Sequence, residues 1–159
     1  MDVLLDLLNS RPMVNGEERD ELGDPANGKR WAREHGGDGS TAELELLREA
    51  RDALRNVVRG ESPPDVLSPL LDGVRQIPEI TSDGLQWTVE TPLHARLAVE
   101  VLLAWAAGEK DQPGRLRPCA NAECQLFLLD RSRANRARWC SMAVCGNRAK
   151  ARRHYERTR

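Results

Sequence analysis

The sequence is poor in aromatic residues, long apolar runs and lysine. One Phe and one Tyr accompany four Trp residues, so aromatic side chains make up 4% of the chain, few for a surface that stacks on RNA bases. No stretch approaches the roughly 18 consecutive apolar residues of a membrane-spanning helix. The chain contains three lysines and 21 arginines, and this excess of arginine is compatible with a G+C-rich bacterial genome. Residues 1–9 show no basic leader, so we expect a cytoplasmic protein.

Cysteine is absent from the first 118 residues, and four follow in two pairs of equal spacing, Cys119-x4-Cys124 and Cys140-x4-Cys145. Two short knuckles joined by a connector of fifteen residues are typical of a tetrahedral Zn²⁺ site. Disulfides are the alternative, but they would leave the long remainder without any, which is unusual for an exported chain. A redox pair is disfavoured because the C-x-x-C spacing is missing. We therefore predict a structural Zn²⁺ ion bound by all four thiolates, with no open coordination position for catalysis.

Charge is divided unequally along the chain. Residues 115–159 contain twelve basic and three acidic side chains, a balance of +9. Since the whole chain carries −1, residues 1–114 carry −10. A strongly basic segment in a near-neutral chain indicates a surface for nucleic acid. The alternative is a basic helix that only confers solubility, for which this much charge is unnecessary.

The hydrophobic pattern predicts an α+β fold, with a mainly helical N-terminal domain over residues 1–112 that contains one β-hairpin. Residues 3–8 begin a helix or strand, and residues 11–21 are expected to form a loop. Asp24-Pro25 and Ser40-x-x-Glu43 are helix starts, the second a capping box. Further elements are expected as a helix over 62–73, a hairpin over 74–90, a helix over 93–107 and a linker over 108–114. Three tryptophans are expected in the core: Trp31, Trp87 and Trp105.

Residues 113–159 predict a small, treble-clef-like zinc finger with four cysteine ligands. Leu126 to Asp130 is expected to form a strand between the knuckles, and Arg138 to Cys140 a second strand. Ser141 is a good N-cap for a helix from Met142 to Arg157. The segment has too few large apolar side chains to fold alone, so the metal must supply the missing stability.

The run Cys145-Gly146-Asn147-Arg148, preceded by Arg138-Trp139-Cys140-Ser141 and by residues 127–130, resembles the CGNR zinc finger. Upstream, Leu5 to Ser10, Asp24-Pro25…Trp31 and Asp83 to Trp87 resemble the ABATE domain of stress-induced transcription regulators. The resemblance covers nearly the whole chain and implies a DNA-binding regulator. Family members usually carry residues before the Leu5-Asp6 motif, so this start is abrupt.

Arginines in a helix behind a zinc knuckle can neutralise phosphates and contact guanine edges. We expect Asn147 to brace the knuckle, and Asn9 and Arg11 to serve in helix capping and a surface salt bridge in preference to ligand binding. The residues predicted to contact DNA are Arg136, Arg138, Arg148, Lys150, Arg152, Arg153 and Arg157.

Three functions compete. In the first, the finger binds double-stranded DNA, and the acidic domain senses a small-molecule effector or recruits a partner. A homodimer is compatible with this role. In the second, the finger binds an acidic protein surface, including the N-terminal domain of another copy. RNA binding ranks third because base-stacking aromatics are scarce. The sequence shows no phosphate-binding glycine loop, Ser/His/Asp arrangement or paired acids, so we expect no enzyme.

Overall fold

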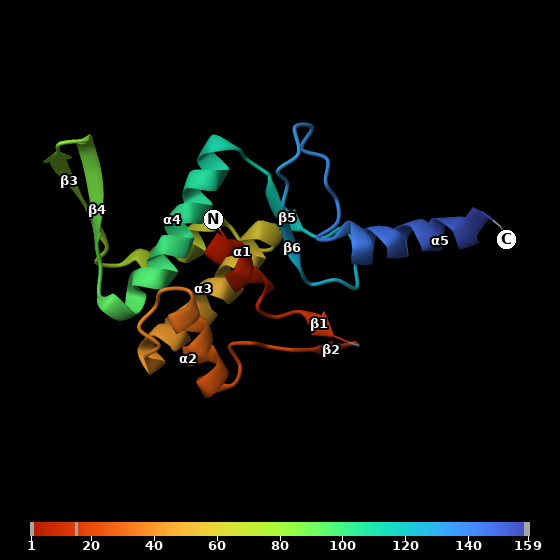
Figure 1. Cartoon of the computed structure of the whole chain (residues 1–159), viewed down its shortest axis with the longest axis horizontal. Helices are drawn as coiled ribbons and strands as arrows, with labels where there is room; N and C mark the ends of the chain where they lie inside the picture. Colours follow the sequence, from red (N-terminus) through yellow and green to blue (C-terminus); the bar gives the residue numbers. More distant parts are fainter. Residues whose placement is uncertain (1, 15, 158–159) are drawn as a thin grey trace.

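The computed structural model describes residues 2–14 and 16–157, without the side chains of Asp2 and Arg153. The molecule is elongated (Figure 1): a β-hairpin projects from one end, a helical body occupies the middle, and a basic helix extends from the other end. The body contains α1 (Asp2–Asn9), α2 (Pro25–Glu34), α3 (Thr41–Arg59), the 3-10 helices η1 (Pro64–Leu71) and η2 (Leu93–Ala95), and α4 (Arg96–Asp111).

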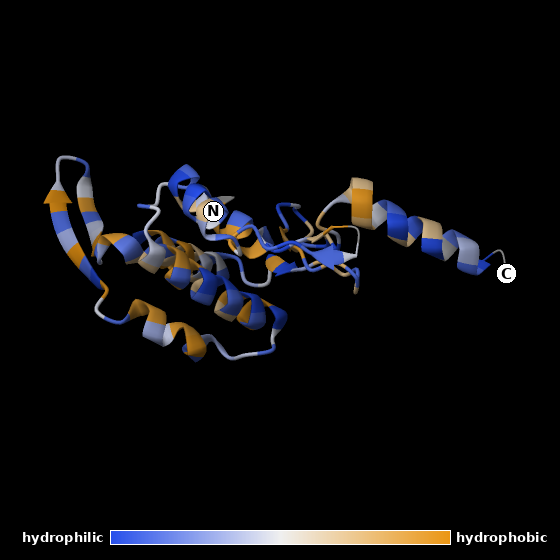
Figure 2. Ribbon diagram, turned by 90° about the horizontal axis from the view of Figure 1, so that it is seen from below, coloured by the Kyte–Doolittle hydropathy of each residue, from blue (hydrophilic) through white to orange (hydrophobic). Residues whose placement is uncertain are grey.

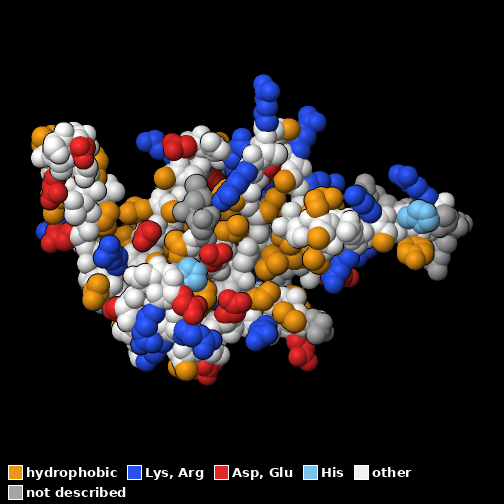
Figure 3. Space-filling model, in the orientation of Figure 1, with side chains coloured by type: hydrophobic (Ala, Val, Ile, Leu, Met, Phe, Trp, Pro, Cys, Tyr) orange, Lys and Arg blue, Asp and Glu red, His pale blue; other side chains and the backbone are white. Residues whose placement is uncertain are grey.

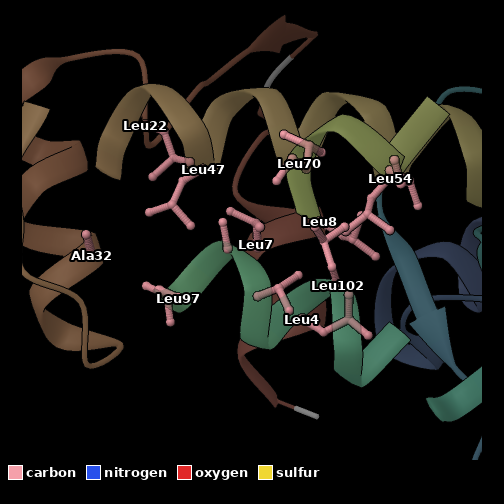
Figure 4. Packing of buried hydrophobic residues seen from close by; sticks show 14 of the residues in the cluster. Leu4, Leu7, Leu8, Leu22, Ala32, Leu47, Leu54, Leu70, Leu97 and Leu102 are labelled. Carbon is pink, nitrogen blue, oxygen red and sulfur yellow. The ribbon is translucent and has the colours of Figure 1, made fainter. Parts of the chain in front are cut away.

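Leucines of α1, α3 and α4 form the core of the body (Figure 4). Leu7, Leu47 and Leu54 are completely buried, and Leu102 is 2% exposed. Each such side chain contributes about 1.5–3 kcal/mol to folding when it leaves water. This core fixes the directions of the three helices, and thereby the surface on which the finger is mounted.

The predicted helix starts at Asp24 and Ser40 are confirmed. The Asp24 carboxylate accepts a hydrogen bond from the Asn27 N–H at 2.9 Å, and Pro25 occupies the first turn. The Ser40 hydroxyl accepts from the Glu43 N–H at 3.1 Å. Glu43 does not reach back to the N-cap amide as in a standard capping box, because its carboxylate accepts from the Gly39 N–H at 2.6 Å instead.

The body differs from the prediction at four places, two of them only in the type or extent of a predicted helix. Residues 11–21 are not only a loop, because β1 (Met13–Val14) and β2 (Glu17–Glu18) form a short antiparallel hairpin. Residues 64–71 form a 3-10 helix, in which Pro69 removes a backbone donor. The helix predicted over 93–107 starts with 3-10 geometry and continues to Asp111.

The hairpin predicted over 74–90 is confirmed as β3 (Arg75–Thr81) paired with β4 (Gly84–Glu90). The fourth difference concerns Trp87, which lies on β4 and is 58% exposed, so its prediction as a core residue is wrong. Trp31 is buried and Trp105 is half-buried against the core, as expected. Every residue of the two strands is exposed except Val89, which is half-buried.

The finger begins with β5 (Leu116–Pro118), which pairs antiparallel with β6 (Phe127–Leu129). The strand between the knuckles is therefore confirmed, but its partner lies before Cys119 and is not the predicted strand at Arg138 to Cys140, which has no strand geometry. Phe127 is 1% exposed and belongs to the core of the body. The finger is thus packed directly against the helices. Within the described ranges, no helix has the length and apolar character to cross a bilayer.

Candidate metal centre and basic face of the finger

The first knuckle is a tight turn at the end of β5. The Cys119 N–H donates to the Leu126 carbonyl at 2.8 Å, and the Cys124 N–H donates to the Asn121 carbonyl at 2.8 Å. These bonds close the chain between the two cysteines and turn their side chains toward one point.

The second knuckle combines a π-helical turn with the basic helix. Residues Met142–Gly146 form the π turn, closed by the Gly146 N–H donating to the Ser141 carbonyl at 3.0 Å, and α5 (Asn147–Arg157) follows. The helix predicted over 142–157 is therefore confirmed in extent, but Ser141 makes no side-chain cap. Asn147 donates to the Ala143 carbonyl at 3.2 Å, so it braces the knuckle as predicted.

The four cysteine sulfurs form one compact cluster, with all of them within 4.8 Å of one another. The Sγ atoms of Cys124 and Cys140 are 3.7 Å apart, as are those of Cys140 and Cys145. A tetrahedral Zn²⁺ site with Zn–S bonds of about 2.3 Å has sulfur–sulfur edges of about 3.8 Å. The donor set and its spacing therefore fit a Zn²⁺ ion that all four residues, Cys119 included, would bind.

Two N–H groups point at the sulfurs and would stabilise thiolate charge. The Asn121 side chain, 9% exposed, donates to Cys145 Sγ at 3.7 Å, and the Cys140 N–H donates to Cys119 Sγ at 3.5 Å. Such bonds orient metal ligands and tune their basicity. Asn121 was not predicted from the sequence, although an amide residue between two knuckle cysteines is a signal that could have identified it.

Burial and hydrogen bonds shift the thiol pKa values of Cys140, Cys124 and Cys119 in different directions. Burial and the neighbouring thiols raise the pKa of Cys140, and burial also raises that of Cys124. For Cys119, burial is outweighed by N–H groups of Cys140 and Asn121, which lower the pKa. A metal that binds here must therefore displace protons from at least two of the thiols at neutral pH.

A shallow groove of about 270 Å³ lies between the first knuckle and α5, and three predicted DNA-contacting arginines line it: Arg138, Arg148 and Arg152. The Arg138 guanidinium lies 5.3 Å from the Trp139 ring centroid, a cation–π contact that orients it. Arg152 is 61% exposed and lies 3.7 Å from Glu123 of the knuckle. We call this feature the finger groove.

The other predicted DNA-contacting residues are not among those that line the finger groove. Arg136 is exposed on the loop after β6, and Lys150 and Arg157 are exposed on α5. The side chain of Arg153 lies outside the described residues. Figure 2 shows hydrophobic colour at the start of this helical segment and hydrophilic colours along much of the rest, and Figure 3 shows Lys and Arg side chains along the finger.

Two arginines of the basic segment have structural contacts. Arg117 donates to the buried Asp130 carboxylate at 2.8 Å, and Arg115 donates to the carbonyls of Asp130 and Ser132 at 2.8 and 2.7 Å. Hydrogen bonds from Ser132 and Ala137, with the charge of Arg117, hold the pKa of Asp130 below its usual range. These contacts fix the loop that carries Arg136.

The finger is joined to the body by polar contacts from the N-terminal motif and α3. Asn9 bonds the backbone of Phe127, and Arg55 donates to the Leu8 carbonyl at 2.6 Å and to Gln125 Oε1 at 3.1 Å. Burial, with Arg59 nearby, lowers the pKa of Arg55 to about 10. Asn9 therefore connects the two parts of the chain and was not recognised in this role from the sequence. Arg11 forms the predicted salt bridge, with Glu18 at 2.6 Å.

Two cysteine knuckles that converge on one metal position, followed by a basic helix, define a zinc-finger protein. Residues 115–158 match the model of the CGNR zinc finger. Residues 1–122 match the ABATE model, described as "Putative stress-induced transcription regulator", and the chain belongs to this family. No curated protein shows a match to the sequence.

Proposed function

We propose that the protein is a transcription regulator that binds double-stranded DNA through the finger groove and α5. The observation that supports this most is the placement of Arg138, Arg148 and Arg152 around one groove on the zinc knuckle. The metal, held by Cys119, Cys124, Cys140 and Cys145, stiffens the knuckles, so these cations keep a fixed spacing. Fixed cations favour a defined register on phosphates and base edges.

Charge and shape support the same assignment. The basic helix lies at the opposite end of the molecule from the projecting hairpin (Figure 1), and residues 1–114 carry −10 against +9 for residues 115–159. The acidic part would be repelled by DNA phosphates, so it would stay away from the duplex while the finger binds. We further propose that residues 113–159 form the DNA-binding domain, and that residues 1–112 form a domain that receives the signal, a small-molecule effector being one candidate.

The charge division also favours a second function, in which the finger binds an acidic protein surface or the body of another copy. Arg152 already lies beside an acidic side chain, Glu123, at 3.7 Å. In this case the same arginines would mediate self-association and DNA binding would be weak at physiological salt.

The test compares the double variant Arg148→Ala/Arg152→Ala with the parent in an electrophoretic shift titration on duplex DNA. We expect at least about a tenfold loss of affinity, since each lost phosphate contact weakens binding and a lost base contact costs about 1–3 kcal/mol. The matched control, Arg19→Ala/Arg30→Ala, removes the same charge from exposed positions of the body and should bind like the parent. A finger variant that binds DNA like the parent but loses self-association would support the second function and overturn the first.

A further inference from the structure

The hairpin of β3 and β4, residues 75–90, has one apolar face and one polar face; we call it the arm. The strand register places Pro78 opposite Trp87 and Ile80 opposite Leu85. These four residues and Val89 share a face because side chains alternate along a strand. The other face carries Arg75, Glu79 and Glu90 with Ile77, and Thr88 donates there to Glu79 at 3.2 Å.

The apolar face is exposed to solvent although it consists of side chain types that are usually buried in a protein core. Ile80 is 82% exposed, and Leu85 and Trp87 are each 58% exposed. Ten large hydrophobic residues are exposed among the described residues, and five of them lie between residues 77 and 93. An isolated two-stranded hairpin is marginally stable in water, so an arm of this kind needs a surface to cover it.

A second apolar feature lies at the base of the arm. A groove of about 620 Å³ runs between β4 and α4, lined by Val89, Leu93, Val99 and Leu103, with Arg96 and Glu100 as its charged members. Leu93 is 66% exposed. Thr91 also lines this α4 groove, and its hydroxyl is shielded from solvent without a hydrogen-bond partner among the described residues.

We propose that the arm of one copy packs in the α4 groove of a second copy, and that the exchange is reciprocal. Arm and groove adjoin in the same chain, so one two-fold axis beside α4 covers both features of both copies at once. A different partner would have to present both a matching arm and a matching groove.

Area and charge agree with a second copy as the occupant. Each arm exposes on the order of 400 Å² of apolar surface, so two arms bury on the order of 800 Å² before the groove walls are counted, and the reciprocal contact reaches the roughly 1,000 Å² that a specific interface needs. The groove offers one positive and one negative side chain, and the apolar face of the arm that would enter it carries no charge. Two identical surfaces of this kind meet without a net like-charge barrier.

The contact is expected through the face of the arm and not through its edge. Pro78 in β3 lacks the N–H that an added strand would need along that edge. Joining two hairpins edge to edge through β3 is therefore disfavoured, whereas insertion of the apolar face into a groove needs no free edge.

Sedimentation velocity of the zinc-loaded full chain from about 1 to 100 µM tests the proposal, because association through a defined surface depends on concentration. The parent should form a dimer in this range. Ile80→Ser/Trp87→Ser should raise the dissociation constant at least about 100-fold. The matched control, Ile77→Ser, removes an exposed isoleucine from the polar face and should change it by less than about twofold.

A mixing experiment separates arm-to-groove exchange from arm-to-arm contact. The groove variant Leu93→Ser/Leu103→Ser should be monomeric alone, yet should form a heterodimer with the arm variant, since one intact arm then meets one intact groove. A parent that stays monomeric at the highest concentration would overturn the proposal, as would a groove variant that dimerises like the parent. A monomer that binds anionic phospholipid vesicles through Trp87 would assign the arm to membranes and also overturn it.

Discussion

The side-chain amide of Asn9 pairs with the backbone of Phe127 as a neighbouring strand would. Its Oδ1 accepts from the Phe127 N–H at 2.7 Å, and its Nδ2 donates to the Phe127 carbonyl at 3.2 Å. The residues are 118 positions apart, and this pair links α1 to the strand between the metal knuckles. The guanidinium groups of Arg55 and Arg59 lie 5.2 and 5.1 Å from the Phe127 ring centroid and complete the junction.

Replacing Asn9 by Ala should destabilise the whole chain. The change leaves a partly buried N–H and C=O of Phe127 without partners, at a cost of about 2–4 kcal/mol in the free energy of unfolding. Chemical denaturation followed by circular dichroism measures this loss. The matched control is Asn56→Ala at an exposed position of α3, which should cost less than about 0.5 kcal/mol. Equal stability of the two variants would show that the junction contributes nothing.

Removing the metal should unfold the finger and also weaken the body. Elemental analysis should give one Zn²⁺ per chain, and Cys140→Ser should lower that content, because three thiolates hold the ion less tightly than four. A chelator should lower the melting temperature of the helical body, since Phe127 leaves its core when β6 unfolds, while most helical signal persists at low temperature. Readdition of Zn²⁺ is the control. Metal-free protein with an unchanged melting profile would contradict the prediction.

The Arg51–Asp20 pair should make stability fall at acidic pH. The guanidinium donates to both Asp20 oxygens, at 2.6 and 2.9 Å, and Arg51 is 1% exposed. Burial alone would raise the pKa of Asp20, but the hydrogen bonds and charge of Arg51 lower it below the ordinary value of 3.8. A carboxylate with a lowered folded-state pKa contributes stability above pH 3.8, and that contribution is lost as the pH falls through the folded-state pKa.

Asp20→Asn should therefore reduce the free energy of unfolding at pH 7 and flatten its decline below about pH 4. Denaturant titrations at several pH values provide the measurement. Asp65→Asn, at an exposed position of η1, is the matched control and should leave the pH profile unchanged. Identical profiles for Asp20→Asn and the parent would exclude a contribution from the pair.

Gly28→Ala should destabilise α2 although alanine favours helices. A Cβ at residue 28 would lie 2.5 Å from Leu44 Cδ1 and 3.2 Å from the Leu22 carbonyl oxygen. The overpacking costs about 1–3 kcal/mol, more than the propensity gain of about 1 kcal/mol. Thermal unfolding checks this. In the double variant Gly28→Ala/Leu44→Val the smaller side chain at residue 44 should restore part of the lost stability. If Gly28→Ala alone stabilises the protein, α2 and α3 are not in close contact at this point.

The metal site and the helix starts could be predicted because they depend on local spacing. Cysteine pairs at x4 spacing and the caps at Asp24 and Ser40 act within a few residues, so their geometry follows from the sequence. Asn9 could not be recognised as a tertiary link, because its partner is a backbone group of a distant strand. The pairing of β5 with β6 was also missed, since three-residue strands have too little alternation to identify a partner.

Trp87 shows a different limit. Alternation around Leu85, Trp87 and Val89 correctly predicted a strand with one apolar face. The pattern identifies which face is apolar but not what covers it, and the body of the same chain does not. Because Trp87 is exposed, it belongs to the proposed dimer contact and not to the core of the body.

The salt dependence of binding to duplex DNA tests the central claim most directly. If the finger groove and α5 neutralise about five phosphates, a plot of log affinity against log salt concentration should have a slope of about −4 to −5, since each contact contributes about −0.9. Arg136→Ala should make this slope less steep by about one unit and should weaken binding equally for all DNA sequences. A parent slope near zero, or an unchanged slope after Arg148→Ala/Arg152→Ala, would contradict the account.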